Sequence, residues 1–212
     1  MNRRCACLLL GILAAGGALA DDPFDFRSAF DVNEGTLNFL TSPPVKAVHF
    51  HQNRIRITPD SLASGWVGLE QCHDDLDKVA RAQITFREGF VRDLRVESSA
   101  HIESAWIEGS SVQLRNVSEG ARLCLAAETK ALRNSGNDFF TLHNGPYMRK
   151  FLDGYYPMRV TIEVEFPART LSLVDITPAA QPGLDIVEAP GTIRLDALFE
   201  GELRTVIQFQ RK

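Results

Sequence analysis

The sequence predicts an all-β protein, an antiparallel β-sandwich with little helix that forms either one sandwich or two β lobes. Apolar and polar residues alternate with a period of two in many segments of about four to eight residues, which is typical of strands with one buried face. The dipeptide Glu-Gly recurs at 34–35, 88–89, 108–109, 119–120 and 200–201. Three of these sites separate neighbouring strand candidates, where glycine supplies the positive φ of a hairpin turn. Antiparallel strands joined in this way favour a sandwich over a barrel.

Residues 1–20 are expected to be an export signal. Arg3 and Arg4 precede the apolar run Leu8–Leu19, and Ala18-Leu19-Ala20 fits the small-x-small pattern of a cleavage site. The apolar run has about 12 residues, whereas a bilayer span needs about 20, so cleavage is favoured over retention as an anchor. We expect a Sec-type route and a periplasmic or secreted protein, and the paired arginines leave a twin-arginine route open.

The remaining chain has an ordinary globular composition. Residues 1–20 contain two of the 23 basic residues and none of the 27 acidic ones, so 192 residues with a net charge of −6 remain. A chain of this length can bury a core in one or two domains. Its acidic balance disfavours a dedicated nucleic-acid binder, and no later segment of the sequence is long and apolar enough to cross a membrane.

The first half of the mature chain is expected to contain an arm and a β lobe. Residues 21–45 are mixed in character and are expected to form an N-terminal arm that lies on the sheet. A disulfide-containing β lobe is expected over 46–132. Its strand candidates are 48–51, 54–57, 83–86, 91–96 and 111–115.

Residues 133–157 interrupt the alternation and are expected to connect two groups of strands. A short helix is predicted over 146–152, because Pro146 suits a first helical turn and Gly154 follows as a stop. The last 55 residues, 158–212, contain four more strand candidates. They form either a C-terminal β lobe or the completion of a single sandwich, since a lobe of this size alone is marginal.

Two cysteines remain after export, Cys72 and Cys124. In an oxidising compartment such a pair most often forms one bridge. Closing the loop of 53 residues between them contributes about 4 kcal/mol in the chain-entropy model. The C-x-x-C spacing of thiol redox proteins is absent from the sequence. We therefore predict a structural disulfide between two strands or at a sheet margin.

His49 and His51 form an H-x-H pair, which on a strand places both imidazoles on one face. With His73 as a third ligand they form the candidate metal site, for Zn²⁺ or Cu²⁺, which suit imidazole donors. The alternative is that this face is solvated and that Val48 and Phe50 supply the apolar face. A lone H-x-H is a weak motif, so a protein without a cofactor is the first expectation.

All three tyrosines lie between residues 145 and 157. Tyr147, Arg149, Tyr155 and Tyr156 are the candidate binding residues, since aromatic rings beside a guanidinium are common at recognition surfaces. The alternative is structural. In that case Tyr147 packs with Phe151 on a helix face, and the Tyr155-Tyr156 pair fills the join between the lobes.

The sequence contains no recognised catalytic motif. It lacks the G-x-S-x-G elbow, the H-E-x-x-H zinc motif and a phosphate-binding loop, so no catalytic residue is assigned. The first hypothesis is an exported β-sandwich without enzymatic activity that binds or assembles with a partner such as a protein or a cell-envelope glycan. A metal-binding protein using His49 and His51, and a hydrolase whose site has no recognised motif, are the alternatives.

Overall fold

Strands account for most of the chain. The computed structural model describes residues 33–212 with the exception of Pro43, and this part contains fifteen strands and one helix of six residues. The all-β prediction is confirmed. The predicted export signal and the first residues of the predicted arm, up to residue 32, lie outside the described residues. In the described part, no helix is long and apolar enough to cross a bilayer.

Nine strands form the larger sheet: β1 (Asn38–Phe39), β2 (Phe50–Arg56), β3 (Val67–Leu76), β4 (Val79–Thr85), β5 (Val91–Glu108), β6 (Ser111–Thr129), β11 (Met158–Glu165), β13 (Leu184–Ala189) and β14 (Thr192–Glu200). Their order is β1–β14–β11–β2–β3–β6–β4, with β13 also on β14 and β5 also on β6. Only β2 and β11 are parallel neighbours in this sheet. β3 and β4 follow one another along β6, because β3 pairs with residues 121–129 and β4 with residues 111–117.

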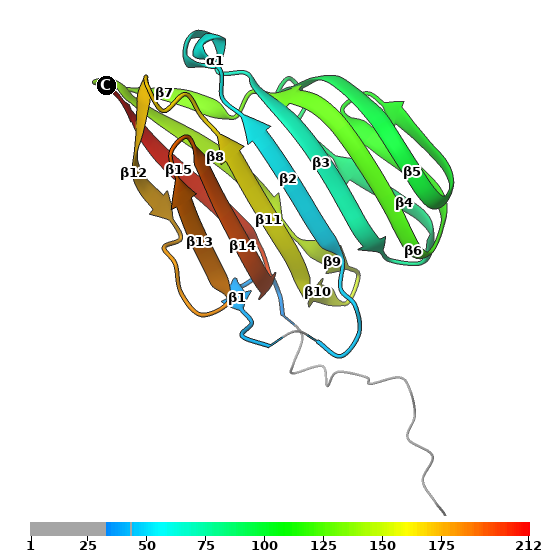
Figure 1. The fold of residues 1–212 in the computed structure, drawn as a ribbon. Coiled ribbons are helices and arrows are strands. Elements are labelled where there is room, and N and C mark those ends of the chain that lie inside the picture. Colours follow the sequence, from blue (N-terminus) through cyan, green and yellow to red (C-terminus); the bar gives the residue numbers. More distant parts are fainter. Residues whose placement is uncertain (1–32, 43) are drawn as a thin grey trace, which may run out of the picture. The chain divides into compact units, whose positions relative to one another are not determined.

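Four strands form the smaller, antiparallel sheet: β12 (Leu171–Thr177), β15 (Leu203–Arg211), β8 (Phe139–Tyr147) and β7 (Leu132–Gly136). Figure 1 shows this sheet against the half of the larger sheet that contains β13, β14 and β11. A separate two-stranded hairpin consists of β9 (Arg149–Phe151) and β10 (Gly154–Tyr156).

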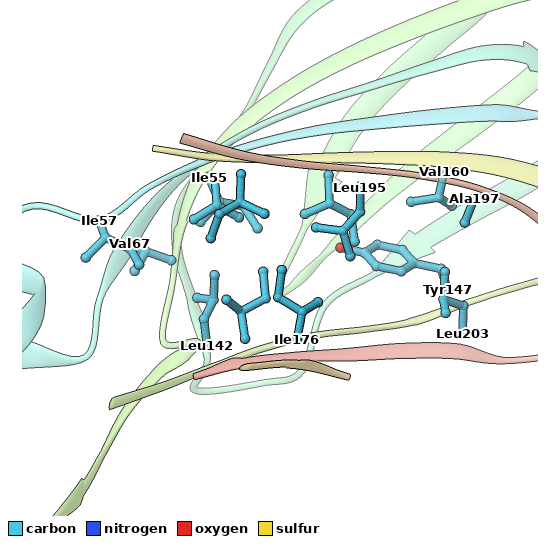
Figure 2. Close-up of a cluster of buried hydrophobic side chains, with 14 of the residues drawn as sticks. Ile55, Ile57, Val67, Leu142, Tyr147, Val160, Ile176, Leu195, Ala197 and Leu203 are labelled. Atoms are coloured by element: carbon cyan, nitrogen blue, oxygen red, sulfur yellow. The ribbon is translucent and has the colours of Figure 1, made fainter. Parts of the chain in front are cut away.

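The main core lies between the two sheets. On β11, Val160, Ile162 and Val164 are buried, whereas Arg159 points to solvent. Figure 2 shows side chains of the larger sheet facing Leu142 and others from the smaller sheet across this layer. The alternation read from the sequence is therefore the alternation between core and solvent.

A second apolar cluster lies on β6 beyond the main core. Its buried members are Val112, Leu114, Val117, Ala121, Leu123 and Leu125. Half-buried apolar residues of β4 and β5 pack against them. The larger sheet thus has two apolar regions, of which the first is covered by the smaller sheet.

The two expected lobes share one sheet. β11, from the C-terminal segment 158–212, pairs in parallel with β2 from the N-terminal segment over residues 159–165 and 50–56. The expected connector 133–157 itself supplies β8, β9, β10 and most of β7. Residues 158–212 therefore complete a single two-sheet unit.

The helix predicted over 146–152 is wrong. β8 pairs with β15 as far as Tyr147, opposite Leu203, and residues 149–151 then pair with 154–156 as the β9–β10 hairpin. Gly154, with φ of 132°, belongs to this hairpin and ends no helix. The strand ladders satisfy the backbone groups of this segment, and a proline–glycine pair with this spacing fits a hairpin as well as a short helix.

The helix α1 (Pro59–Ser64) was not predicted from the sequence. Pro59 occupies its first turn, the amide of Thr58 donates to Ser61 Oγ at 3.0 Å, and Gly65 ends it with φ of 76°. These are ordinary start and stop signals. Six residues are too few to show a helical period, which explains why the pattern was overlooked.

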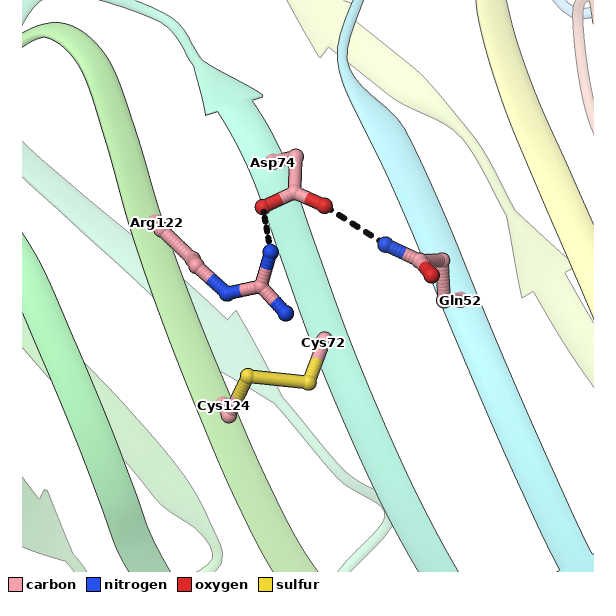
Figure 3. Close-up of a disulfide and its surroundings, with 5 residues drawn as sticks. All are labelled: Gln52, Cys72, Asp74, Arg122 and Cys124. Atoms are coloured by element: carbon pink, nitrogen blue, oxygen red, sulfur yellow. Dashed lines mark hydrogen bonds and ion pairs between the residues drawn. A yellow bond between two sulfur atoms is a disulfide. The ribbon is translucent and has the colours of Figure 1, made fainter.

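The predicted disulfide is confirmed. Cys72 on β3 and Cys124 on β6 are directly opposite in the antiparallel register and are bonded to each other. Figure 3 shows the bridge beside Asp74, which accepts from Arg122 at 2.8 Å and from the Gln52 amide at 2.5 Å. The bridge joins adjacent strands within the larger sheet.

Candidate functional site

A cleft of about 1050 Å³ lies where the smaller sheet stops covering the larger one. Its walls come from β2, β3 and β4 of the larger sheet and from β7, β8, β9 and β15. The apolar residues of β4 that face it, Val79, Ala82 and Ile84, are only half-buried. The cleft therefore offers apolar surface that the protein itself leaves uncovered.

A belt of polar side chains crosses the wall formed by β2 and β3. The antiparallel register places His51 opposite His73 and Asn53 opposite Gln71. The exposed fractions of His51, His73, Asn53 and Gln71 are only 7%, 3%, 4% and 6%, respectively. Next to the belt on β2 and β3, Ile55 and Leu69 belong to the main core, and the second apolar cluster lies on β6.

The side chains of the belt contact one another and the neighbouring His49. His49 Nε2 lies 2.8 Å from His73 Nδ1, and the His51 and His73 ring centroids are 4.2 Å apart. Gln71 Nε2 contacts His51 Nε2 and donates to Asn53 Oδ1 at 3.2 Å. Two buried atoms, His73 Nε2 and Gln71 Oε1, have no hydrogen-bond partner in the described part of the chain. Because unpaired buried polar atoms are costly, these two mark a place where a ligand or an ion would be stabilised.

The three imidazoles are neutral at pH 7. Burial lowers the pKa of His49 from its ordinary value near 6.5 to about 4, although the carboxylates of Asp77 and Asp74 oppose the shift. Burial, together with the charge of His49, lowers the pKa of His51 to about 3. Burial also holds the pKa of His73 well below its ordinary value. Each ring therefore carries one N–H and one free lone pair.

The structure brings His49, His51 and His73 together and turns them inward. The alternative interpretation, in which this face of β2 is solvated, is wrong for His51. Phe50 instead lies on the opposite face, with its ring centroid 4.8 Å from the guanidinium of Arg159. As the side chains stand, no three His, Cys, Asp or Glu residues within the described ranges have the arrangement of a complete metal site.

The four candidate binding residues divide into two pairs. Tyr147 and Arg149 line the cleft, and the edge of the Tyr147 ring packs on His51 with centroids 5.1 Å apart. Burial raises the pKa of the Tyr147 hydroxyl. Tyr155 is buried away from the cleft and donates to Glu202 at 3.1 Å, and Tyr156 donates to Asp153 at 2.6 Å.

Arg149 spans the cleft at the polar belt. Its guanidinium donates to both carboxylate oxygens of Asp77, with Nε to Oδ2 at 2.9 Å and Nη2 to Oδ1 at 2.5 Å. Asp77 occupies the corner between β3 and β4, whereas Arg149 begins β9. This bidentate pair joins the hairpin to the larger sheet.

Most of the charged residues that line the cleft are cations. The cleft is lined by seven of them, Arg81, Arg87, Lys130, Arg133, Arg149, Lys150 and Arg204, and by a single acid, Asp77. Arg149 uses that acid, and Arg204 pairs with Glu202 at 3.3 Å. Within the described residues, the other five have no carboxylate at ion-pair distance. The cleft is therefore positive on a chain whose net charge is −4.

No family model, curated protein or solved structure matches this chain.

The sequence predicted Arg149 as a binding residue, but the other cations, the acid and the amides of the site were not predicted from it. Asn53 and Gln71 do carry a local signal, because both fall at core-facing positions of alternating strands. A polar residue at such a position is unusual and marks a buried network. The cations carry no such signal, since they come from separated elements and alternate with acids along the chain.

Proposed function

We propose that the protein is an exported binding protein that holds an anionic ligand with an apolar portion in the cleft between its two sheets. The observation that carries this proposal is the charge of the cleft: seven cations and one acid line it. Random placement on an acidic chain would give a lining closer to neutral. A concave site with one sign of charge attracts ligands of the opposite sign and raises their local concentration.

The apolar part of the ligand is argued from β4. Val79, Ala82 and Ile84 are half-buried and line the cleft, as do Phe86 and Phe90 just after the strand. Each Å² of apolar surface that a ligand covers there contributes about 25 cal/mol. An anion without an apolar part would leave this wall exposed to water.

The size of the cleft favours a small molecule or the end of a chain. Ligand sites typically enclose about 300–1,000 Å³, and this cleft has about 1050 Å³. Of the two partner classes expected from the sequence, an acidic cell-envelope glycan fits this concave site better than a protein face, and the apolar wall adds an acidic lipid fragment to the candidates. The export signal predicted at 1–20 and the disulfide support a location outside the cytoplasm.

The test is calorimetric titration of the purified protein with decanoate and with decyl maltoside, which also has a ten-carbon chain but no charge. We expect decanoate to bind at least tenfold more tightly. The double variant Arg81→Gln/Arg133→Gln removes two unpaired cleft cations and should weaken decanoate binding at least tenfold, about 1.4 kcal/mol.

The matched control is Arg54→Gln/Arg95→Gln, which removes the same charge from exposed positions outside the cleft. It should leave the affinity within twofold of the parent protein. Equal affinities for the two amphiphiles, equal losses in the two double variants, or no binding of decanoate would each refute the proposal.

A further inference from the structure

We infer that His49, His51 and His73 form a binding site for a transition-metal ion, Zn²⁺ or Cu²⁺, on the wall of the cleft. The inference is independent of the proposed anionic ligand, because it concerns the histidine side chains alone. All three residues line the cleft, and His49 is the most exposed of them, so the ion would enter from solvent at His49.

The first argument is the contact between His49 and His73. Their facing nitrogens, Nε2 and Nδ1, are 2.8 Å apart and share one proton. Two imidazole nitrogens bound to one tetrahedral zinc ion at about 2.1 Å are roughly 3.4 Å apart. Replacing the shared proton by a metal ion therefore requires the two rings to separate by well under 1 Å, and the proton moves to the other nitrogen of the ring that carried it, so that both rings stay neutral.

The second argument is the pair of unpaired buried atoms. A histidine that binds a metal through one nitrogen usually donates its other N–H to an acceptor. With the metal on Nδ1, His73 presents Nε2–H, which has no partner within residues 33–212. Gln71 Oε1 is an unused acceptor on the same face of β3. A metal ion on Nδ1 would fix Nε2 of His73 as a donor, and we infer that the amide of Gln71 turns to place Oε1 as its acceptor.

The third argument concerns the third ligand. The His51 ring is tilted by 30° to that of His73 with centroids 4.2 Å apart, and its Nε2 contacts the amide of Gln71. Rotation of its imidazole away from Gln71 offers a nitrogen to the same ion. Burial keeps all three rings neutral, which is the form that binds metals. Three imidazoles leave a fourth position open toward the cleft.

The alternative is a purely structural polar belt, and metal titration separates the two. The protein is expressed without an affinity tag, freed of metal with a chelator, and titrated with ZnCl₂ or CuSO₄ alone. We expect one ion per chain. His49→Gln should weaken binding at least tenfold, whereas His143→Gln, which also lines the cleft, should change it less than twofold. His49 is chosen because it is the most exposed of the three, so its replacement is the least disturbing to the fold.

Paramagnetic resonance of the Cu²⁺ form provides a readout that a structural role would not produce. Two or three coordinated nitrogens are expected, with one fewer in His49→Gln. No saturable binding, equal affinities of His49→Gln and His143→Gln, or a copper spectrum without nitrogen coupling would overturn the inference. Each result is obtained without the anionic ligand, so it leaves the test of the cleft function unaffected.

Discussion

At the scale of single residues, the polar belt shows how a sandwich tolerates buried amides and imidazoles. Asn53 Nδ2 donates to the carbonyl of Thr161 on β11 at 3.4 Å, while Asn53 Oδ1 accepts from Gln71. A polar group at a core position costs free energy unless it is paired. Most of the belt is paired, and its two orphan atoms, His73 Nε2 and Gln71 Oε1, belong to residues that line the cleft.

Gly65 is a second residue whose role depends on its surroundings. It adopts φ of +76° at the end of α1, and a Cβ there would lie 2.7 Å from the carbonyl oxygen of Leu132. Gly89 has a similar φ of +75°, yet a Cβ there would meet nothing within 4 Å. We expect Gly89→Ala to lower the free energy of unfolding by about 1 kcal/mol, the cost of the left-handed backbone alone, and Gly65→Ala by about 3 kcal/mol or more.

Urea unfolding of the two variants measures this difference directly. Gly89→Ala is the matched control, because the substitution and the backbone conformation are the same. Equal losses of stability in the two variants would mean that the contact with Leu132 relaxes without cost.

At the scale of elements, β6 is the strand on which the larger sheet depends. It pairs with β3, β4 and β5 and carries the whole buried part of the second apolar cluster. The disulfide links Cys124 of β6 to Cys72, which lies directly opposite it on β3. Because the three partners meet on one strand, a change in the register of β6 would displace the cleft wall formed by β3 and β4.

Removal of the disulfide should cost stability and preserve the fold. Cys72→Ala/Cys124→Ala frees a loop with a sequence separation of 52 in the unfolded chain, so the free energy of unfolding should fall by about 2–4 kcal/mol. Circular dichroism should show the same strand content at 25 °C, since β3 and β6 remain paired by their backbone ladder. The reduced parent protein should unfold at the same urea concentration as the variant. A variant unfolded in the absence of urea would contradict the expectation.

At the scale of the whole molecule, the neutral histidines make stability depend on pH. The unfolded chain protonates its histidines near pH 6.5, whereas the folded state resists until pH 4 for His49 and pH 3 for His51. Between these values the unfolded state binds more protons, so stability is complete above pH 6.5 and falls as the pH is lowered. Burial lowers the pKa of His49 most, the carboxylates of Asp77 and Asp74 raise it, and the guanidinium of Arg149 lowers it; the value of about 4 is the net result.

For His49 alone the loss between pH 7 and pH 4 amounts to about 3 kcal/mol. Urea unfolding across this range, in a chelator so that no metal is bound, measures it. The carboxylates of the protein also titrate there, so the comparison is with His49→Gln, whose curve should be flatter by that amount. Parallel curves for the two proteins would show that His49 is protonated in the folded state near its ordinary pKa.

The fold class followed from local patterns, because alternation of period two, hairpin glycines and a cysteine pair are properties of short segments. They predicted strands such as 203–209 and 111–115, which the structure contains within β15 and β6. Local patterns also led to the wrong prediction of a helix over 146–152, because proline and glycine fit both a helix and a hairpin there. Only the pairing of β8 with β15, between segments some 60 residues apart, decides for the hairpin.

The candidate site divides in the same way. By itself the sequence determined that His49 and His51 share a face of one strand, since alternation follows from backbone geometry. Only the tertiary structure decided that this face is buried and meets His73, because both faces of the strand carry polar and apolar residues and the neighbouring sheet selects one. The positive cleft was likewise decided by folding, which brings cations from β4, β7, β9 and β15 to one surface. These cations form one positive surface only when the two sheets pack against each other.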